Sequence, residues 1–508
     1  MTIDSPQRIH ELVERQAAAY PDGIGIVHGE QQPMSWRLFS DAINEVATFL
    51  RCAGVIPGDR VLIIAENAMS TAVFIFAASK AGAIAVPVNA RMSAPEIEAI
   101  KLHVSPRVVV FTVAASEAAV DHANAMQAEV LELWYGNVAL VTLSDAEAVS
   151  DNEVGDTAVI LYTTGTTGAP KGVMLTHGNL LFAGQASADA RQLKREDLVY
   201  GVLPLTHVFG LASMLMAGAT VGSCIQLETR FNPEKVYAAL INDVTVFPAV
   251  PQMHALVLDY ARENGLNNVQ GGKLRYVSSG AAPLDPSWKR KAEAFYGIAL
   301  QNGFGMTEST AGVSTTNNAI GSADISVGCP LPGVEVKISL PVNNNESRPE
   351  GEILTRGPHV MFGYFKNPQA TDLALDADGF LHTGDIGWVD KTGLLHISGR
   401  SKELIIRGGF NVFPPEVESA LNGHSDVVQS AVIGRALQSG DEEILAFVQR
   451  ANDSDLSEAS LKAFVAKRLT AYKCPTQIVF VERLPAAATG KILKHRLLSL
   501  FADELAEA

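Results

Sequence analysis

The chain contains little cysteine. Its 508 residues include four, Cys52, Cys224, Cys329 and Cys474, which lie far apart with no Cys-x-x-Cys pair. Structural zinc sites usually need closely spaced cysteines, and disulfide frameworks are typical of short secreted chains. The pattern therefore argues against a structural zinc site and favours a reducing compartment. We expect the four thiols to be small buried core residues.

Positive charge is also scarce. Lys and Arg number 39 against 55 Asp and Glu, which gives a formal net charge of -16. Surfaces that bind nucleic acid or anionic membranes need an excess of Lys and Arg. We therefore expect no nucleic-acid partner, and an anionic ligand would have to be held at a local site.

Targeting and membrane signals are missing as well. The first residues, Met-Thr-Ile-Asp-Ser-Pro, lack a basic segment followed by an apolar one, so the cytoplasm is the expected compartment. Residues 199–227 carry no Asp, Glu, Lys or Arg and are long enough to cross a bilayer. Pro204, His207 and four glycines interrupt this stretch. We therefore expect a buried strand, loop and helix around a substrate pocket, and no transmembrane segment.

What the sequence does contain is apolar periodicity. Hydrophobic residues make up 47% of a chain longer than one core usually supports, so two or more domains are expected. Helical spacing over 43–50 precedes a strand at 60–65, and an apolar helix at 71–81 leads into strands at 83–88 and 108–112. The alternation predicts an α/β fold with a large N-terminal domain of helix-covered, mostly parallel sheets.

The pattern changes near Lys402. About a hundred residues follow, with two short strands (427–433 and 444–448) and an amphipathic helix. One face of that helix carries Leu461, Phe464, Val465 and Leu469. We expect an N-terminal domain at 1–401 and a small mobile α+β domain at 402–508.

A Thr/Gly-rich loop follows the apolar run 158–162. Four threonines, two glycines and one lysine lie between Thr163 and Lys171, so amides, hydroxyls and a cation can converge on one anion. The loop differs from the Walker pattern because two residues separate Gly165 from Gly168 and Pro170 precedes the lysine. An ordinary P-loop NTPase is not expected, and a mobile turn is the alternative reading.

Four further motifs lie downstream. Residues 278–284 and 301–308 bring glycine-rich backbone, a ring at Phe304 that a purine could stack on, and a carboxylate at Glu308 that could hold magnesium. In 382–385, Asp385 could accept hydrogen bonds from ribose hydroxyls, with Arg400 as a cationic donor. The last two motifs are Gly408-Gly409-Phe410-Asn411-Val412-Phe413-Pro414-Pro415-Glu416 and Thr489-Gly490-Lys491. Each motif alone is typical of a turn or an exposed lysine.

Together, in this order, the five motifs resemble those of the adenylate-forming superfamily, which contains acyl-CoA synthetases, adenylation domains of peptide synthetases and luciferases. The resemblance covers nearly the whole chain and includes 54–61, 80–83 and 86–89 in the N-terminal region. Phe304 stands where the family usually has tyrosine, which keeps the ring face and loses a hydroxyl. Residues 485–488 lack the basic residue often found before the lysine motif.

The resemblance implies a two-step reaction with ATP, Mg²⁺ and coenzyme A. A carboxylate attacks the α-phosphate of ATP and expels pyrophosphate, and a thiol then displaces AMP from the acyl-adenylate. The resemblance also implies the residues that hold the nucleotide. They are, for the β- and γ-phosphates, Thr163, Thr164, Gly165, Thr166, Thr167, Gly168 and Lys171; for the α-phosphate, Thr307; for magnesium, Glu308; for the ribose, Asp385 and Arg400; and for the adenine, Gly280, Ala281, Ala282, Gln301, Asn302, Gly303 and Phe304.

Three further roles follow from the same resemblance. Lys491 would act electrostatically in the first step and leave the site in the second. The small domain would swing about a hinge at Lys402, and Gly408 and Gly409 would then line a tunnel for the pantetheine arm.

For the acid, the resemblance points to a mostly apolar pocket, with walls at His207, Val208, Phe209, Gly210, Val250, Ser279, Gly280 and Met306. His207 could act at the acyl or thiol site or be a hydrogen-bonded core histidine. Val208 and Phe209 offer no aspartate for an α-amine, so free amino acids are disfavoured. No cation lies near His207 in the sequence, although Arg230, Arg275 or Lys273 could fold back towards it. We expect an apolar monocarboxylic acid, fatty or aromatic.

Alternatives stay open. A stand-alone adenylation enzyme that loads a carrier-protein thiol would share every motif. A luciferase-like oxygenase is disfavoured because the C-terminus does not end in Ser-Lys-Leu. A non-catalytic binding protein is disfavoured because the charged residues of the motifs are present. A homodimer is compatible with the sequence.

Overall fold

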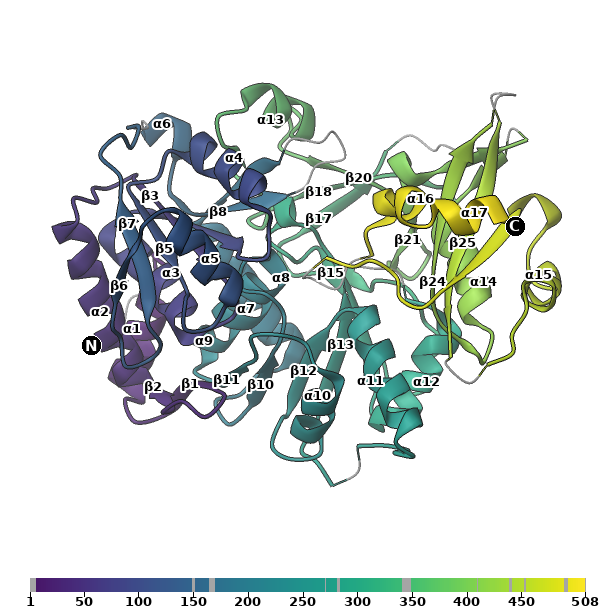
Figure 1. Ribbon diagram of the computed structural model, residues 1–508, viewed down its shortest axis with the longest axis horizontal. Helices are drawn as coiled ribbons and strands as arrows, with labels where there is room; N and C mark the ends of the chain where they lie inside the picture. The colour runs from purple at the N-terminus through teal and green to yellow at the C-terminus, as the bar shows by residue number, and fades with distance from the viewer. Residues whose placement is uncertain are drawn as a thin grey trace.

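The computed structural model describes residues 6–148, 151–163, 170–269, 271–280, 284–339, 349–408, 410–437, 441–451, 454–487 and 492–507. A large N-terminal domain of sheets and helices is followed by a smaller C-terminal domain (Figure 1). In Figure 1 the purple and blue elements of the first domain lie on the left and the lime and yellow elements of the second lie on the right. The predicted fold class is confirmed.

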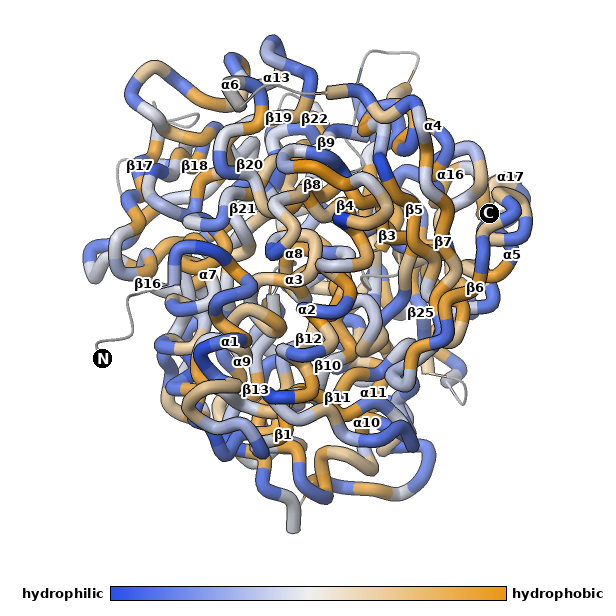
Figure 2. Tube along the Cα trace, turned by 90° about the vertical axis from the view of Figure 1, so that its left-hand side faces the viewer, coloured by the Kyte–Doolittle hydropathy of each residue, from blue (hydrophilic) through white to orange (hydrophobic). Residues whose placement is uncertain are grey.

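The first sheet has the order β19-β9-β8-β4-β3-β5-β7-β6. Its central strands β3, β4, β5 and β8 are parallel and its edges are antiparallel. The predicted strand at 60–65 is buried along its whole length, because helices cover both faces. The apolar character of these strands is visible in Figure 2. The strands are β3 (Arg60–Ala65), β4 (Ile84–Asn89), β5 (Val108–Phe111), β6 (Glu129–Leu131), β7 (Val138–Thr142), β8 (Thr157–Thr163), β9 (Lys171–Thr176) and β19 (Gly363–Tyr364).

The second sheet has the order β16-β15-β14-β13-β12-β10-β11-β1-β2 and is parallel from β14 to β1. Short antiparallel strands extend both edges. The strands are β1 (Ile24–His28), β2 (Met34–Ser35), β10 (Leu198–Gly201), β11 (Cys224–Leu227), β12 (Val246–Ala249), β13 (Tyr276–Gly280), β14 (Leu300–Phe304), β15 (Ser314–Thr315) and β16 (Cys329–Pro330).

Helix α3 (Met69–Ala81) lies between the two sheets. It contacts β3 and β4 of one sheet and β1 of the other, and every residue except Lys80 is buried. The other helices of this domain are α1 (His10–Ala19), α2 (Trp36–Cys52), α4 (Ala94–Val104), α5 (Glu117–Ala125), α6 (Asp151–Val154), α7 (His177–Arg191), α8 (Val208–Gly210), the π-helix η1 (Leu211–Met216), α9 (Ala217–Val221), α10 (Pro233–Leu240), α11 (Pro251–Glu263), α12 (Pro286–Tyr296), the 3₁₀ helix η2 (Thr307–Ser309) and α13 (Pro368–Ala374).

The uncharged segment 199–227 folds as expected into buried strands and short helices, from β10 through α8, η1 and α9 to β11. Among the described residues, no helix is long and apolar enough to cross a membrane. The expectation of four buried cysteines is wrong. All four are free thiols, but Cys52 and Cys329 are exposed, and Cys224 and Cys474 are only partly buried.

A four-stranded antiparallel sheet, β17-β18-β20-β21, leads to the C-terminal domain. Its strands are β17 (Glu335–Ile338), β18 (Gly351–Arg356), β20 (Leu381–Val389) and β21 (Leu395–Arg400). The C-terminal domain packs two helices on a sheet of order β24-β25-β26 and adds the hairpin β22-β23. Its elements are η3 (Ser401–Glu403), β22 (Ile405–Arg407), β23 (Phe410–Val412), α14 (Pro414–Asn422), β24 (Val427–Ala436), β25 (Glu442–Arg450), α15 (Glu458–Ala466), η4 (Ala471–Lys473), β26 (Gln477–Val481), η5 (Lys494–Arg496), α16 (Leu497–Leu500) and α17 (Ala502–Glu507).

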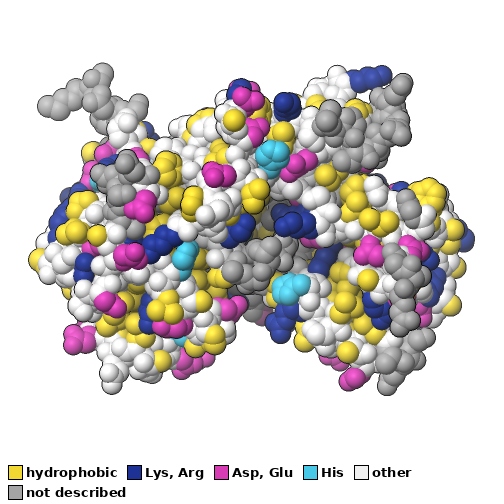
Figure 3. Space-filling view, turned by 90° about the horizontal axis from the view of Figure 1, so that it is seen from above, with side chains coloured by type: hydrophobic (Ala, Val, Ile, Leu, Met, Phe, Trp, Pro, Cys, Tyr) yellow, Lys and Arg dark blue, Asp and Glu magenta, His cyan; other side chains and the backbone are white. Residues whose placement is uncertain are grey.

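Both predicted strands of this domain are present and longer than expected. The predicted helix ends at Ala466, so Leu469 lies beyond it, although its side chain still packs against the core of the domain. The two domains touch where Ser419 Oγ donates to Asp285 Oδ2 at 2.6 Å. From above, a hollow separates the two masses, and Lys, Arg and His side chains gather at its edges (Figure 3).

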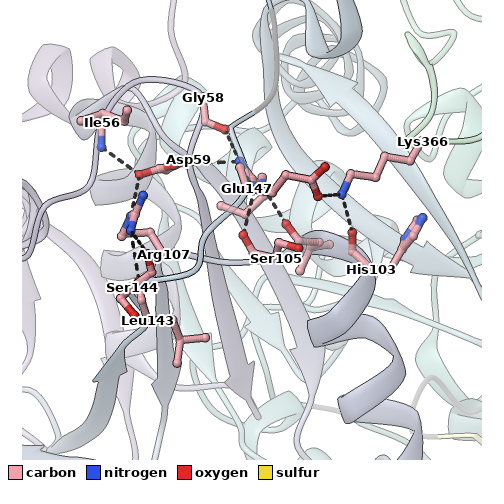
Figure 4. A network of polar contacts seen from close by, with 12 residues as sticks. Ile56, Gly58, Asp59, His103, Ser105, Arg107, Leu143, Ser144, Glu147 and Lys366 are labelled. Carbon is pink, nitrogen blue, oxygen red and sulfur yellow. Dashed lines mark hydrogen bonds and ion pairs between the residues drawn. The ribbon is translucent and has the colours of Figure 1, made fainter.

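A polar network joins the segment that follows β19 to α4 and to the loop that contains Glu147 (Figure 4). Lys366 pairs with Glu147 and donates to the carbonyl of His103 at 3.2 Å. The buried guanidinium of Arg60 donates to four backbone carbonyls, one of them that of Glu147, and Arg107 pairs with Asp59. The network therefore fixes the segment after β19 against α4 and this loop.

Candidate active site

A cavity of about 1150 Å³ lies between the domains, at the carboxyl ends of β13 and β14. Ligands of open α/β sheets commonly bind at this edge. Many residues expected at the site line the cavity. They are Thr163, Lys171, His207, Val208, Phe209, Ser279, Gly280, Gly303, Phe304, Met306, Thr307, Glu308, Arg400 and Lys402.

Other expected residues lie behind the lining. The side chain of Gln301 bonds to residues Thr316 and Asn318, and that of Asn302 donates to the carbonyl of Ser326 at 2.9 Å. Val250 packs in the apolar core around α11. A Cβ at Gly210 would lie 2.2 Å from the carbonyl oxygen of Pro204, so this glycine serves close packing.

Gly408 lies in the turn between β22 and β23, where its amide donates to Asp441 Oδ1 at 2.7 Å. It is not among the residues that line the cavity. Several expected residues lie outside the described part of the chain, namely Thr164, Gly165, Thr166, Thr167, Gly168, Ala281, Ala282, Gly409 and Lys491. On either side of Lys491, the described residues Ala486, Ala487 and Leu493 line the cavity.

The Thr/Gly loop joins two antiparallel strands. Thr163 ends β8 and pairs with Lys171, the first residue of β9. A Walker loop instead leads from a strand into a helix. The loop departs from the Walker spacing because its scaffold is different. Here a hairpin brings a threonine and a lysine to one side of the cavity.

A tyrosine connects this lysine to the predicted magnesium ligand. Tyr364 of β19 donates its hydroxyl to Glu308 Oε1 at 2.8 Å, and Lys171 Nζ lies 4.7 Å from the centroid of its ring. Burial, with the Glu308 carboxylate beside it, raises the pKa of the Tyr364 phenol well above its usual range, so the hydroxyl remains a donor. No sequence motif pointed to Tyr364. Its place depends on the pairing of β19 with β9 and on the Lys366 network.

The segment after β14 is bent sharply into the cavity. Thr307 and Glu308 are buried in the short helix η2. The two residues that follow this helix, Thr310 and Ala311, adopt left-handed φ values of 47° and 76°. Non-glycine residues in this region carry backbone strain and cluster at functional sites. The strained turn directs Thr307 and Glu308 towards the space that Lys171 and Tyr364 face.

The predicted ribose site is a cross-strand pair. Asp385 of β20 lies opposite Arg400 of β21, and Arg400 Nε donates to Asp385 Oδ1 at 3.0 Å. The carboxylate is buried, while 41% of the arginine side chain is exposed. Arg400 lines the cavity together with Thr383 and Gly384 of the same motif.

His207 precedes α8 at the cavity wall. Its Nδ1 accepts from the backbone amide of Phe209 at 3.3 Å, which caps the helix. With Nδ1 used as an acceptor, the remaining ring proton is on Nε2. The capping bond by itself does not decide between the two expectations for His207.

Comparison with known proteins identifies the family. Residues 13–365 match the family model of the AMP-binding enzymes, and residues 416–491 match the C-terminal domain of AMP-binding enzymes. The chain belongs to the AMP-binding enzyme family. It is 32% identical to a feruloyl-CoA synthase of Amycolatopsis sp, over 96% of this chain and 98% of that protein.

Two further relatives extend the comparison. A 4-coumarate–CoA ligase of Oryza sativa subsp. japonica is 32% identical over 96% of this chain and 94% of its own length. The crystal structure of ATP-bound MatB from Rhodopseudomonas palustris superposes with a TM-score of 0.83 at 29% identity, covering 98% and 99% of the two chains. The expectation of an AMP-forming acid–thiol ligase is confirmed by these matches.

Proposed function

We propose that this protein is an acyl-CoA synthetase that joins a carboxylic acid to coenzyme A through an acyl-adenylate, at the expense of ATP. One observation carries the proposal. A single cavity is lined by Lys171, Thr307, Glu308 and Arg400, which suit a nucleoside triphosphate, and also by the apolar residues Val208, Phe209 and Met306.

In the first half-reaction two anions must approach each other, so the site has to neutralise charge. Lys171 and the residues of the Thr/Gly loop would hold the β- and γ-phosphates, and Thr307 the α-phosphate. Asp385 would accept from the ribose hydroxyls while Arg400 fixes the carboxylate. Lys491 would come from the C-terminal domain, whose residues Ala487 and Leu493 line the same cavity. Phosphoryl chemistry of this kind depends mostly on positioning.

Glu308 is the residue that would hold Mg²⁺. No group of three or more His, Cys, Asp or Glu side chains that could bind a metal is found among the described residues. A single carboxylate is sufficient here, because Mg²⁺ is usually bound through one or two carboxylates together with substrate phosphates and water. When bound, the ion would supply positive charge to the phosphate oxygens. Tyr364 orients the carboxylate through its hydroxyl.

The second half-reaction would use a rearranged small domain. We place the domain boundary between 401 and 402 and the hinge at Lys402. The 3₁₀ helix that contains Lys402 lies directly between β21 and β22, which supports this placement. Gly408 lies away from the cavity in the present arrangement, as it would before a swing that brings Gly408 and Gly409 to the pantetheine tunnel.

The acid should have an apolar body, fatty or aromatic. Val208, Phe209 and Met306 supply apolar wall, and the positions after His207 are occupied by Val208 and Phe209, with no aspartate there to recognise an α-amine. Two relatives, a feruloyl-CoA synthase and a 4-coumarate–CoA ligase, are named for aromatic acids, which supports an aromatic acid as the substrate here. We also propose that the protein works in the cytoplasm, since its four cysteines are free thiols and suit a reducing compartment.

A panel of carboxylic acids in the ATP–pyrophosphate exchange assay tests the proposal. At least one acid should support exchange, and coenzyme A should then convert the adenylate to an acyl thioester. Lys491→Ala should abolish most exchange. Exchange that persists in this variant would contradict the role of Lys491, and the lack of exchange with any acid would contradict the proposed function.

A carrier-protein thiol is the second candidate acceptor. The sequence motifs do not separate it from coenzyme A. Acyl transfer to a holo carrier protein with none to free coenzyme A would favour it. Light emission on addition of oxygen would indicate the less favoured luciferase-like oxygenase.

A further inference from the structure

The wall of the cavity contains a buried arginine that the proposed chemistry does not use. Arg191 ends α7, is only 7% exposed, and lines the cavity together with Ser213, Tyr276 and Ser278. Tyr276 begins β13, the strand that ends at Gly280. The side chain of Tyr276 lies beside the guanidinium and reaches Thr315, which pairs with Gly303 of β14. Arg191 therefore belongs to the wall formed by β13, β14 and α7.

The cationic group of Arg191 has few partners. Nη1 donates to the carbonyl of Ser213 in the π-helix η1, and the Tyr276 hydroxyl lies beside the guanidinium. Within the described residues, no carboxylate lies within ion-pair distance of Arg191. A guanidinium carries five N–H donors, and a buried charge without a counter-charge is strongly unfavourable.

Arg60 provides a comparison within the same chain. It is fully buried, its guanidinium donates to four backbone carbonyls, and Asp59 lies 4.0 Å away. A purely structural buried arginine is thus surrounded by acceptors here. Arg191 faces a cavity instead, and this difference indicates a ligand as the missing partner.

The neighbouring hydroxyls support the same conclusion. The Oγ atoms of Ser278 and Ser314 are buried and form no hydrogen bond within the described structure, and both residues line the cavity. Buried polar groups nearly always have a partner. A wholly apolar acid would leave these two hydroxyls and the cation unsatisfied.

Three other cations were candidates from the sequence for binding a polar group of the acid, and all three form ion pairs with carboxylates. Arg230 pairs with Glu66, Arg275 with Asp197, and Lys273 with Asp243. None of the three lines the cavity. Their carboxylate partners satisfy them. Arg91, which does line the cavity, also pairs with Glu66, whereas Arg191 lines it without a carboxylate partner among the described residues.

We propose that Arg191 binds a second oxygen group of the acid, separate from the carboxylate that is activated. This inference rests on the proposed function and narrows its substrate class. The acid has an apolar middle, packed against Phe209 and Leu331, and ends in a carboxylate or in a hydroxyl or carbonyl oxygen. Each of these groups offers Arg191 an oxygen that carries negative charge or accepts hydrogen bonds. Ser278 and Ser314 complete the site.

Matched acids in the ATP–pyrophosphate exchange assay test this proposal. One series is cinnamate, 4-hydroxycinnamate and 4-carboxycinnamate, and the other is octanoate and octanedioate. In the unaltered protein the acids with a terminal oxygen should have kcat/KM values at least ~10-fold above the matched apolar acid. The hydroxyl and carboxylate members distinguish a neutral acceptor from an anion. Equal values for matched acids would overturn the proposal without any variant.

Arg191→Leu should remove this preference and raise activity with cinnamate or octanoate relative to the oxygen-bearing partner. Arg191→Lys should keep part of the preference for a terminal carboxylate, because it keeps the charge. Lys194→Met, on the exposed surface three residues away, is the matched control and should change nothing. If Arg191→Leu lowers kcat/KM equally for all acids, Arg191 is only structural. If no acid supports exchange in the unaltered protein, the proposed function itself fails.

Discussion

At the scale of single residues, side chains acquire their roles from neighbours that are remote in the sequence. Glu308 is held by Tyr364, which is 56 positions away, and the same tyrosine ring lies beneath the ammonium of Lys171. A hydroxyl that donates to one carboxylate oxygen fixes the rotamer and would leave the other oxygen for the metal ion. Tyr364 is therefore a positioning residue of the proposed magnesium site.

Tyr364→Phe should weaken the first half-reaction. The change removes the hydrogen bond to Glu308 but keeps the ring beneath Lys171, so kcat/KM for exchange should fall about tenfold, equivalent to ~1.4 kcal/mol. The Mg²⁺ concentration needed for half-maximal exchange should rise. Tyr237→Phe, which removes a tyrosine hydrogen bond to the carbonyl of Asn268 outside the cavity, serves as the control. An unchanged Mg²⁺ requirement in Tyr364→Phe would show that Tyr364 does not position the metal ligand.

At the scale of secondary-structure elements, a buried histidine links two helices and one strand behind the proposed acid pocket. His254 of α11 donates from Nε2 to the carbonyl of Ser278 in β13 at 3.1 Å, and its Nδ1 accepts from the hydroxyl of Tyr296 in α12 at 2.9 Å. Burial lowers the pKa of His254 to about 4. Only the bond from Tyr296 needs the neutral ring, because the Nε2–H group donates to Ser278 in either protonation state. The contact between α11 and α12 therefore depends on the protonation of His254.

The folded protein should lose stability as the pH falls from about 6.5 to about 4. In this window the unfolded chain binds a proton at His254 that the folded chain does not, so stability rises with pH. The group contributes about 1.4 kcal/mol per pH unit. His254→Gln should reduce the pH dependence of the urea-unfolding free energy by about this amount. An unchanged slope in His254→Gln would contradict the assignment.

At the scale of the whole molecule, the cavity is bounded by both domains. Lys402 and Glu403 line it from the linker, and Ala486, Ala487 and Leu493 line it from the C-terminal domain. The arrangement suits the first half-reaction, since the segments on either side of Lys491 face the site. The second half-reaction would need a rotation about the linker.

Lys402→Pro should separate the two half-reactions. Proline fixes φ and removes the amide donor, which would stiffen the proposed hinge. Exchange should stay within about threefold of the unaltered protein, while thioester formation from supplied acyl-adenylate and coenzyme A should slow more than ~10-fold. Lys391→Pro, in the turn between β20 and β21, is the matched control for a new proline. Equal slowing of both steps would contradict the hinge.

Much of the fold and of the candidate site could be predicted from the sequence. The strands at 60–65 and 108–112, the buried helix at 71–81 and the two strands of the second domain were predicted because their periodicity is local. The motifs around Lys171, Thr307 and Arg400 were recognised because each is a short contiguous stretch. Their residues meet in one cavity.

By itself, the sequence determined the fold class, the family and the nucleotide side of the site, since backbone propensities and motif chemistry act over a few residues. Only the tertiary structure decided which cations line the cavity. Arg230, Arg275 and Lys273 were found paired with carboxylates, whereas Arg191, at the end of an ordinary helix, was found buried in the cavity wall. Whether a charged side chain is available to a ligand depends on its burial and on its partners across distant elements, and neither is encoded in its immediate neighbours.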